Sequence, residues 1–209
     1  MTRGHAFRDN PAQYLLGVFN AKGRRGYALL GTLVLIGALE WGGDPMRLAL
    51  RYQRGAVADG EWWRLLTAHL VHLDLAHAVV NAAGLVLVWA LVVDEFPMRR
   101  WALVVLLSMF AISGGLWTLY PSVNWYVGAS GVLHGLLAAG ILGGVRRGDR
   151  VAWIALVLLV LKLGFESWAG PLAFTAGKPV VTAAHWLGAL GGAAGGLLAV
   201  LSTGAKDPA

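Results

Sequence analysis

Six apolar segments alternate with polar connections along the chain. A membrane-spanning helix needs about 20 predominantly apolar residues, and tilt and partial burial widen that range. The hydropathy pattern therefore predicts an all-α membrane protein: a bundle of six transmembrane helices with a long outward-facing first loop. The expected segments are residues 27–41, 76–93, 101–120, 130–145, 151–168 and 180–201.

The first segment, residues 27–41, is the shortest of the six. An Arg24-Arg25 flank followed by a brief apolar run is similar to a secretory signal peptide. A signal peptide would end in a small-x-small cleavage site, whereas Glu40 and Trp41 interrupt any such site here. We therefore predict that this segment is retained as a span.

The connection between the first two segments, residues 42–75, is too long to be a turn. It contains the sequence EWWRLLTAHLVHL, residues 61–73. This pattern favours interfacial helices, with Trp62 and Trp63 at the depth of the lipid headgroups, where tryptophan is enriched.

The distribution of Lys and Arg predicts the orientation in the membrane, because cytoplasmic connections carry an excess of these residues. Of the 17 Lys and Arg, eleven fall on one side, five fall on the other and Lys162 lies inside a segment. We expect residues 1–26 and 202–209 to be cytoplasmic tails, and residues 42–75 to be a periplasmic loop of a bacterial inner-membrane protein. The eleven are Arg3, Arg8, Lys22, Arg24, Arg25, Arg99, Arg100, Arg146, Arg147, Arg150 and Lys206; the five are Arg47, Arg51, Arg54, Arg64 and Lys178.

Composition supports the membrane class and excludes several others. Of 209 residues, 57% are hydrophobic and 13% are charged, whereas a soluble domain carries about a quarter charged residues. Without cysteine there is no disulfide, thiolate zinc site or cysteine nucleophile. The basic residues lie in short connections, so we expect lipid rather than nucleic acid as a partner. We find no internal repeat and predict a single domain, residues 1–209.

Three polar side chains from different segments are expected at a similar depth. Ser130 lies 16 residues before Arg146, about 24 Å from the cytoplasmic end, and Asn81 lies 13 residues before Asp94, about 20 Å from that end. His185 lies about 8 Å below the outer end of its segment. In a core about 30 Å thick, all three fall in the outer third. Because polar groups are expensive in a membrane, this grouping indicates a buried site.

Two stripes of small residues predict that the fourth and sixth segments pack closely, since such faces let helix backbones approach each other. Ser130 borders the first stripe, and His185 lies three residues before the second. A hydrogen bond of about 3 Å between these two side chains is therefore expected. The stripes are Gly131, Gly135, Ala139 and Gly143, and Gly188, Gly192 and Gly196.

A serine bonded to a histidine is a nucleophile with its general base. The tetrahedral intermediate of acyl transfer also needs hydrogen-bond donors. The backbone N–H of Ser130 at a helix N-terminus can supply one. His77 and Asn81, spaced i, i+4 on one helix face, can supply others. No carboxylate is obviously placed to orient His185, so we predict a Ser–His dyad, with Glu166 left open as a third member.

Four motifs together resemble the rhomboid family of intramembrane serine proteases. They are EWWRLLTAHLVHL in the first outer loop, HAVVN (residues 77–81) on the second segment, GASG (residues 128–131) before the fourth and AHWLGALGG (residues 184–192) on the sixth. The resemblance covers most of the chain and implies a six-helix core with a water-filled cavity that opens outward. It also implies Ser130 as nucleophile, His185 as base, and His77, Asn81 and the Ser130 amide as oxyanion donors. Gly128, Gly131 and Gly188 would support the site.

The chain departs from that family pattern at one position. The residue four after the serine is typically an aromatic that stacks on the histidine, whereas here it is His134. Together with the compact length, this substitution resembles the bacterial rhombosortase subfamily. That resemblance implies a single-pass membrane substrate with a GlyGly-CTERM tail, which is a glycine-rich motif, a transmembrane helix and a basic tip. His134 would stack on His185, bond to it or make it more sensitive to pH.

Each candidate residue also has a structural interpretation. Ser130 is a common helix N-cap residue, His185 and His134 are compatible with packing roles, and polar residues such as His77 and Asn81 often join membrane helices. Lys162 and Glu166, spaced i, i+4, are expected to neutralise each other near the outer end of the fifth segment, with gating as a lesser alternative. We expect His69 and His72 to lie at the membrane interface or to form hydrogen bonds in the outer loop. We expect Arg64 to brace this loop against the lipid headgroups. His69, His72 and His77 match no metalloprotease spacing, so we expect no metal and no cofactor.

Two function classes follow from these residues. The first is an intramembrane serine protease that cleaves near the outer face of the membrane. The second is a non-catalytic rhomboid-like protein that binds membrane helices in quality control. Such relatives generally lack the serine or the histidine, and this chain has both. A small transporter or scaffold would need a polar path through the membrane, but the cytoplasmic halves of the segments are apolar.

Overall fold

The computed structural model describes residues 23–170 and 180–201. The predicted C-terminal tail and most of the predicted N-terminal tail lie outside the described residues, as do Lys178 and Lys206 from the charge distribution. The described part is mainly α-helical and includes one two-stranded sheet.

Each predicted apolar segment coincides with a helix whose ends agree with the prediction to within about three residues. A short 3-10 helix, η1 (Val93–Glu95), follows the second of them. The six helices are α3 (Arg24–Trp41), α7 (Leu75–Val92), α8 (Met98–Thr118), α9 (Ser130–Arg146), α10 (Arg150–Ala169) and α11 (Ala183–Leu201).

The helices differ in their ability to cross a membrane. Among the described residues, four are long and apolar enough: α7 with η1, α8, α10 and α11. Helix α3 meets the same criteria only together with α4 (Gly43–Leu50), from which it is bent by 112°. Helix α9 has 17 residues, or about 26 Å of rise. The chain is thus a membrane protein with four to five candidate spans, and the count of six spans stays a prediction.

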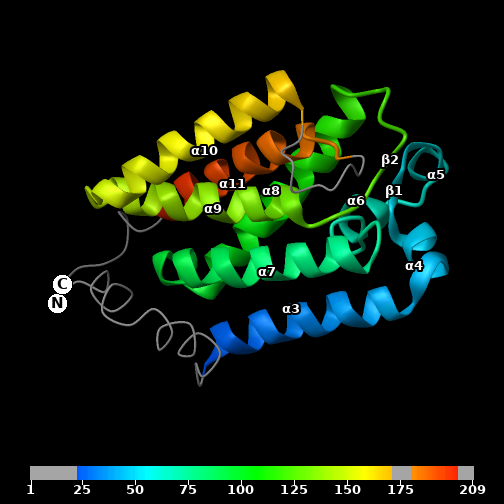
Figure 1. Cartoon of the computed structure of the whole chain (residues 1–209), viewed down its shortest axis with the longest axis horizontal. Coiled ribbons are helices and arrows are strands. Elements are labelled where there is room, and N and C mark those ends of the chain that lie inside the picture. Colours follow the sequence, from blue (N-terminus) through cyan, green and yellow to red (C-terminus); the bar gives the residue numbers. More distant parts are fainter. Residues whose placement is uncertain (1–22, 171–179, 202–209) are drawn as a thin grey trace.

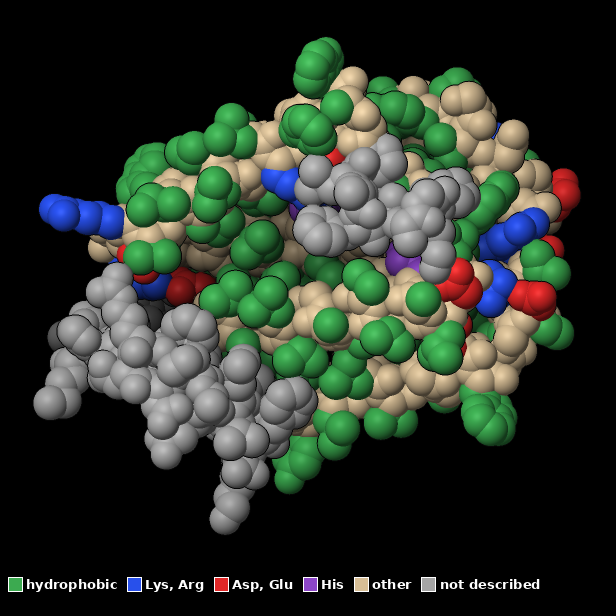
Figure 2. All heavy atoms as spheres, viewed as in Figure 1, with side chains coloured by type: hydrophobic (Ala, Val, Ile, Leu, Met, Phe, Trp, Pro, Cys, Tyr) green, Lys and Arg blue, Asp and Glu red, His purple; other side chains and the backbone are tan. Residues whose placement is uncertain are grey.

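The surface agrees with a membrane environment. Figure 2 shows apolar side chains over the middle of one face, with most of the charged side chains toward its two ends. Large exposed apolar residues such as Val34, Leu87 and Ile154 lie on α3, α7 and α10. Soluble proteins rarely expose apolar patches of that extent, so these faces are suited to lipid.

Helix α9 lies at the centre of the bundle (Figure 1). It packs against α7, α8, α10 and α11, whereas α3 packs against α7. Because protein buries most of its side chains, α9 does not need a full-length lipid-facing surface. Non-helical backbone at membrane depth is tolerated where protein or a water-filled cavity covers it. A short helix that begins inside the molecule is therefore compatible with the fold.

The outer connection, residues 42–75, folds at one end of the bundle (Figure 1) as α4, β1 (Tyr52–Gln53), α5 (Arg54–Ala58) and α6 (Arg64–Thr67). The interfacial helices predicted over residues 61–73 are wrong in extent, since only the four-residue α6 forms there. The mostly helical fold is confirmed, and one small sheet that was not predicted is added to it. Strand β1 pairs antiparallel with β2 (Trp125–Tyr126). The backbone N–H and C=O groups of the two loop segments thus hydrogen-bond to each other, and the hydropathy pattern does not predict this pairing.

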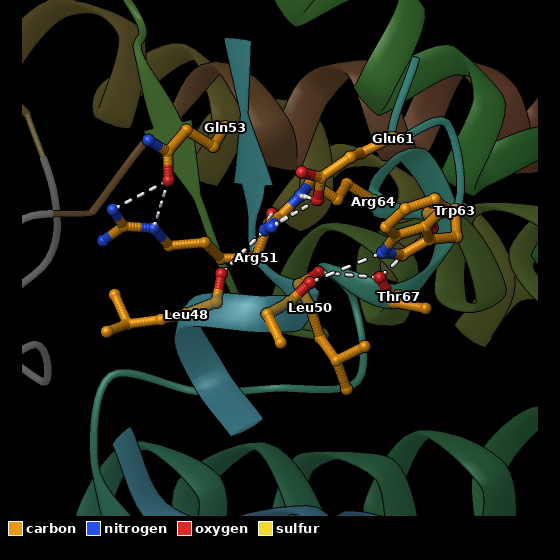
Figure 3. A network of polar contacts seen from close by, with 9 residues as sticks. Leu48, Leu50, Arg51, Gln53, Glu61, Trp63, Arg64 and Thr67 are labelled. Atoms are coloured by element: carbon orange, nitrogen blue, oxygen red, sulfur yellow. Dashed lines mark hydrogen bonds and ion pairs between the residues drawn. The ribbon is translucent and has the colours of Figure 1, made fainter. Parts of the chain in front are cut away.

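Arg64 holds the outer connection together from inside (Figure 3). Its side chain donates to the carbonyl oxygens of Leu48 at 2.7 Å and Arg51 at 2.9 Å, and to the carboxylate of Glu61 at 2.7 Å. The residue is only 7% exposed. Arg64 therefore braces the loop, as expected, but through buried backbone carbonyls and not through lipid headgroups.

Other side chains of the connection tie it to neighbouring backbone. Trp63 donates to the Ala49 carbonyl at 3.4 Å, and the Thr67 hydroxyl donates to the Leu50 carbonyl at 2.7 Å (Figure 3). Arg54 binds the carbonyls of Leu116, Trp117 and Tyr120 at and just beyond the C-terminal end of α8, where helical carbonyls lack intrahelical partners. These bonds fix the connection over the end of the bundle where α9 begins.

Candidate active site

Ser130 is the first residue of α9, and the outer connection fixes the turn before it. Gly128 has a φ of 118°, a conformation that residues with a Cβ rarely adopt. The Gly128 N–H donates to the Ala68 carbonyl at 2.9 Å, and the Tyr126 hydroxyl donates to the Gly128 carbonyl at 2.7 Å. These bonds determine where the GASG turn ends and where Ser130 starts the helix.

Helices α9 and α11 pack with their backbones in close contact, as the small-residue stripes predicted. A Cβ placed on Gly188 would lie 2.0 Å from the Gly131 carbonyl oxygen, and one on Gly192 would lie 2.1 Å from that of Gly135. Gly143 differs from the prediction, because a Cβ there would meet the Glu95 carboxylate instead of α11. The close approach at the outer end of the stripe brings Ser130 and His185 together.

The Nε2 atom of His185 lies 3.0 Å from the Ser130 hydroxyl oxygen. Ser130 also lines a cavity of about 300 Å³, together with His77 and residues of the segment that contains β2. His185 is only 6% exposed. His185 is thus enclosed by protein, whereas Ser130 faces a cavity that can hold a short peptide segment of another protein.

His77 and Asn81 lie one turn apart on α7, as predicted, but they have different surroundings. His77 lines the cavity, and its Nδ1 accepts a hydrogen bond from the Leu73 N–H at 3.3 Å. In a neutral imidazole the proton is then on Nε2. Asn81 is buried, does not line the cavity and donates from Nδ2 to the His77 carbonyl at 2.9 Å. The structure therefore brings His77 to the cavity, with Asn81 bonded to its backbone.

His134 occupies the position of the stacking aromatic. Its ring is stacked on that of His185, with centroids 4.4 Å apart and an interplanar angle of 18°. Its Nδ1 lies 2.7 Å from the backbone carbonyl oxygen of Ser130. Of the three roles expected for His134, the structure shows stacking on His185. The bond to the Ser130 carbonyl holds the His134 ring in place on α9.

Glu166 is the site residue that sequence reasoning did not assign. Its Oε2 lies 2.8 Å from Nδ1 of His185 and 2.8 Å from the Lys162 ammonium, so the predicted Lys162–Glu166 pair forms and has a further partner. A signal was available: Glu166 lies 16 residues after Arg150, about 24 Å along α10, and Ser130 lies the same 16 residues from Arg146 on α9.

The same cluster contains residue types that can bind a metal ion. His134, Glu166 and His185 place ligand atoms within 4.8 Å of one another. However, the Lys162 ammonium contacts His134 Nε2 and Glu166 and lies 3.4 Å from His185 Nδ1. A positive charge bonded to two of the three ligands repels a second cation, so the donor set does not fit a resident metal ion.

His69 and His72 have structural positions in the outer connection. His69 lies 3.2 Å from the Ser113 hydroxyl, and the backbone N–H of His72 donates to Glu40. Both rings are buried, and burial lowers the pKa of each from 6.5 to about 4. They are therefore neutral at pH 7, and their bonds join the outer connection to Ser113 on α8 and to Glu40 on α3.

The comparison with known proteins decides the family. The model of the rhomboid domain matches residues 59–203, which include every candidate residue above. The chain belongs to the rhomboid family. This rhomboid is 30% identical over 142 residues to the rhomboid protease GluP of Bacillus subtilis, a match that covers 64% of the chain and 24% of GluP.

Two further relatives show the breadth of the similarity. A mitochondrial RHOMBOID-like protein 6 of Arabidopsis thaliana is 33% identical over 110 residues, which cover 52% of this rhomboid and 31% of the relative. A putative rhomboid protease YdcA of Bacillus subtilis is 34% identical over 80 residues, which cover 38% of this rhomboid and 40% of YdcA. The matches thus span less than half the length of each of these relatives.

Proposed function

We propose that this rhomboid is an intramembrane serine endopeptidase in which Ser130 and His185 carry the chemistry. The observation that carries the proposal is the 3.0 Å contact between His185 Nε2 and the Ser130 hydroxyl, at the edge of a cavity and in a chain of the rhomboid family. A serine that only caps a helix has no need of a buried imidazole as partner.

The reaction follows from these two groups. The Ser130 oxygen attacks the scissile carbonyl carbon as its proton passes to His185 Nε2. The carbon–nitrogen bond then breaks as His185 gives that proton to the leaving amine. A water molecule attacks the acyl-enzyme, loses a proton to His185 and releases the second product, and Ser130 regains its proton.

The oxyanion of the tetrahedral intermediate needs donors near Ser130. The Ser130 amide lies at the N-terminus of α9, where the helix dipole favours negative charge. The Nε2–H of His77 lines the same cavity. We assign these two groups as direct donors. Asn81 is the third proposed donor; because it is buried outside the cavity lining and bonded to the His77 carbonyl, its side chain must turn toward the cavity to reach the oxyanion.

The substrate is a single-pass membrane protein cut near the outer face of the bacterial inner membrane. The basic residues Arg146, Arg147 and Arg150 lie at the end of the bundle opposite to Ser130, which supports a periplasmic site and cytoplasmic termini. His134 at the aromatic position supports a GlyGly-CTERM anchor as the segment removed. Glycines weaken the helix of the substrate and so expose its scissile carbonyl.

The test is co-expression with an exported protein that ends in a GlyGly-CTERM tail, followed by intact-mass analysis of the product. We expect a cut beside the glycine motif, with at least a thousandfold slower cleavage (~10³) by Ser130→Ala and His185→Ala. Ser167→Ala, which alters an exposed hydroxyl on α10, is the matched control and should retain full activity.

Each other outcome has a definite meaning. Cleavage by a folded Ser130→Ala protein contradicts the protease proposal, and a wild-type protein without Ser130-dependent fluorophosphonate labelling supports the helix-binding alternative. Cleavage of other membrane substrates but not of the GlyGly-CTERM protein keeps the protease and rejects the substrate.

A further inference from the structure

Three side chains from α9 and α10 contact the imidazole of His185. Lys162 and Glu166 come from α10, and His134 comes from α9. Glu166 is only 5% exposed, although a glutamate is almost never buried without partners. Its Oε2 lies 2.8 Å both from His185 Nδ1 and from Lys162 Nζ.

One set of protonation states satisfies every contact of 3.0 Å or less in this cluster. An ionised carboxylate only accepts hydrogen bonds, so His185 carries its proton on Nδ1 and presents Nε2 as an acceptor to the Ser130 hydroxyl. The backbone carbonyl of Ser130 likewise places the proton of His134 on Nδ1. His134 Nε2 is then an acceptor for the Lys162 ammonium. The cluster thus holds one cation, one anion and two neutral imidazoles.

Lys162 explains why a carboxylate can remain charged here. A buried carboxylate is costly unless it is paired and hydrogen-bonded. The ammonium donates to Glu166 and to His134, which joins the carboxylate to the ring stacked on His185. If Lys162 and Glu166 only neutralised each other, neither the Lys162–His134 contact nor the Glu166–His185 contact would be needed.

We propose that Glu166 is a positioning residue that completes a Ser130–His185–Glu166 triad, with Lys162 and His134 holding the carboxylate and the imidazole in place. This inference rests on the proposed function and adds a third member to the Ser–His pair. Glu166 keeps His185 in the tautomer that can accept the Ser130 proton, and its charge stabilises the imidazolium that forms. Glu166 itself takes no proton during the reaction.

The decisive variant is Glu166→Gln, which preserves shape and removes the charge. Both bonds fall on the same carboxylate oxygen, Oε2, so the amide oxygen of the glutamine can still accept from Lys162 and from His185 Nδ1. What the variant lacks is the negative charge that stabilises the imidazolium formed when His185 takes the Ser130 proton. We expect kcat to fall at least a hundredfold (~10²) with KM within about twofold. Glu166→Asp, which keeps the carboxylate, should recover part of the loss.

A matched control is Glu95→Gln. Glu95 is also a mostly buried carboxylate paired with a cation, Arg147, but it lies at the other end of the bundle. This variant should retain wild-type kcat. Proton and nitrogen-15 spectra of the histidines give a second readout: both proteins should show His185 protonated on Nδ1, and the Nδ1–H proton resonance should lie further upfield in Glu166→Gln, because a neutral oxygen is a weaker acceptor than a carboxylate.

The outcomes separate this inference from the proposed function. If Ser130→Ala is inactive while Glu166→Gln keeps kcat within about twofold of wild type, the protease stands and the triad is rejected. If Ser130→Ala still cleaves, the proposed function is rejected, and the spectra alone judge the Glu166–His185 bond. If Glu166→Gln does not fold, the aspartate variant decides: an inactive, folded Glu166→Asp protein with His185 still protonated on Nδ1 overturns the proposal.

Discussion

Gly128 combines two constraints two residues before the proposed nucleophile. Its φ of 118° disfavours any side chain, and a Cβ at this position would lie 2.9 Å from the His77 ring. The first constraint affects folding, whereas the second affects a proposed oxyanion donor. A well-chosen pair of variants can separate the two.

We predict that Gly128→Ala loses activity beyond its loss of stability. Backbone strain should lower the free energy of unfolding by about 1–3 kcal/mol, and displacement of His77 should lower kcat/KM by about tenfold or more. The control is Gly60→Ala, which has a φ of 99° but open space around its Cβ. Thermal unfolding in detergent and cleavage assays check both. Equal activity of the two variants would contradict a role for the His77 position.

His185 illustrates how little of a side chain's chemistry follows from its own sequence context. On α11 it is the third residue of an apolar helix. Its contacts with Ser130, Glu166 and the His134 ring come from two other helices. The tautomer in which its Nε2 accepts from Ser130 depends on the bond between Nδ1 and Glu166, which comes from a different helix than Ser130.

Helices α9 and α11 set the distance between the proposed nucleophile, Ser130, and its proposed base, His185. Both carry a glycine stripe at the shared face, and these stripes replace side-chain packing by backbone contact. The separation of the two helix backbones therefore controls the Ser130–His185 hydrogen bond. Any added side chain on this face increases the separation.

We predict that Gly188→Ala destabilises the protein and uncouples the Ser–His pair. Its Cβ would lie 2.0 Å from the Gly131 carbonyl oxygen, so the helices must move apart, at a cost of about 1–3 kcal/mol or more. We expect a lower melting temperature and loss of fluorophosphonate labelling of Ser130. Gly164→Ala on the exposed side of α10, where nothing lies within 4 Å, should change neither. Unchanged labelling in Gly188→Ala would show that the helix contact is not needed for the pair.

Across the whole molecule, the outer connection covers the end of the bundle that contains the site. The β1–β2 pair binds it to the segment before α9, and Arg54 binds it to α8. His69 and His72 are buried within the same connection, and burial lowers the pKa of each to about 4. These two residues couple the stability of the connection to pH.

We predict that stability falls as the pH is lowered from about 6.5 toward 4. The unfolded chain binds protons near the ordinary histidine pKa of about 6.5, whereas the folded protein does not until about pH 4. Between about pH 6.5 and pH 4, each histidine lowers the free energy of unfolding by up to about 1.4 kcal/mol for every unit by which the pH falls. Above about pH 6.5, neither histidine changes the free energy of unfolding with pH. Thermal unfolding in detergent between pH 5 and pH 8 measures the slope. His69→Gln should flatten it, and an unchanged slope would contradict the assignment to His69.

Much of this arrangement is predictable from sequence because its causes are local. Hydropathy and helical rise give the six helices to within about three residues, since an apolar run in a membrane must satisfy its own backbone groups. The glycine stripes predict the α9–α11 contact, and with it the approach of Ser130 to His185. Depth along a helix follows from residue counting alone.

Other features depend on how separate segments are rotated and paired, which residue counting does not give. The β1–β2 pair joins segments more than 70 residues apart, and neither strand is long enough to show a period. Arg64 faces backbone carbonyls instead of lipid because the loop folds over it. Sequence places Glu166 at the right height, but the rotation of α10 about its axis turns it toward His185. Height is a property of one helix, whereas the meeting of two side chains is a property of the packed bundle.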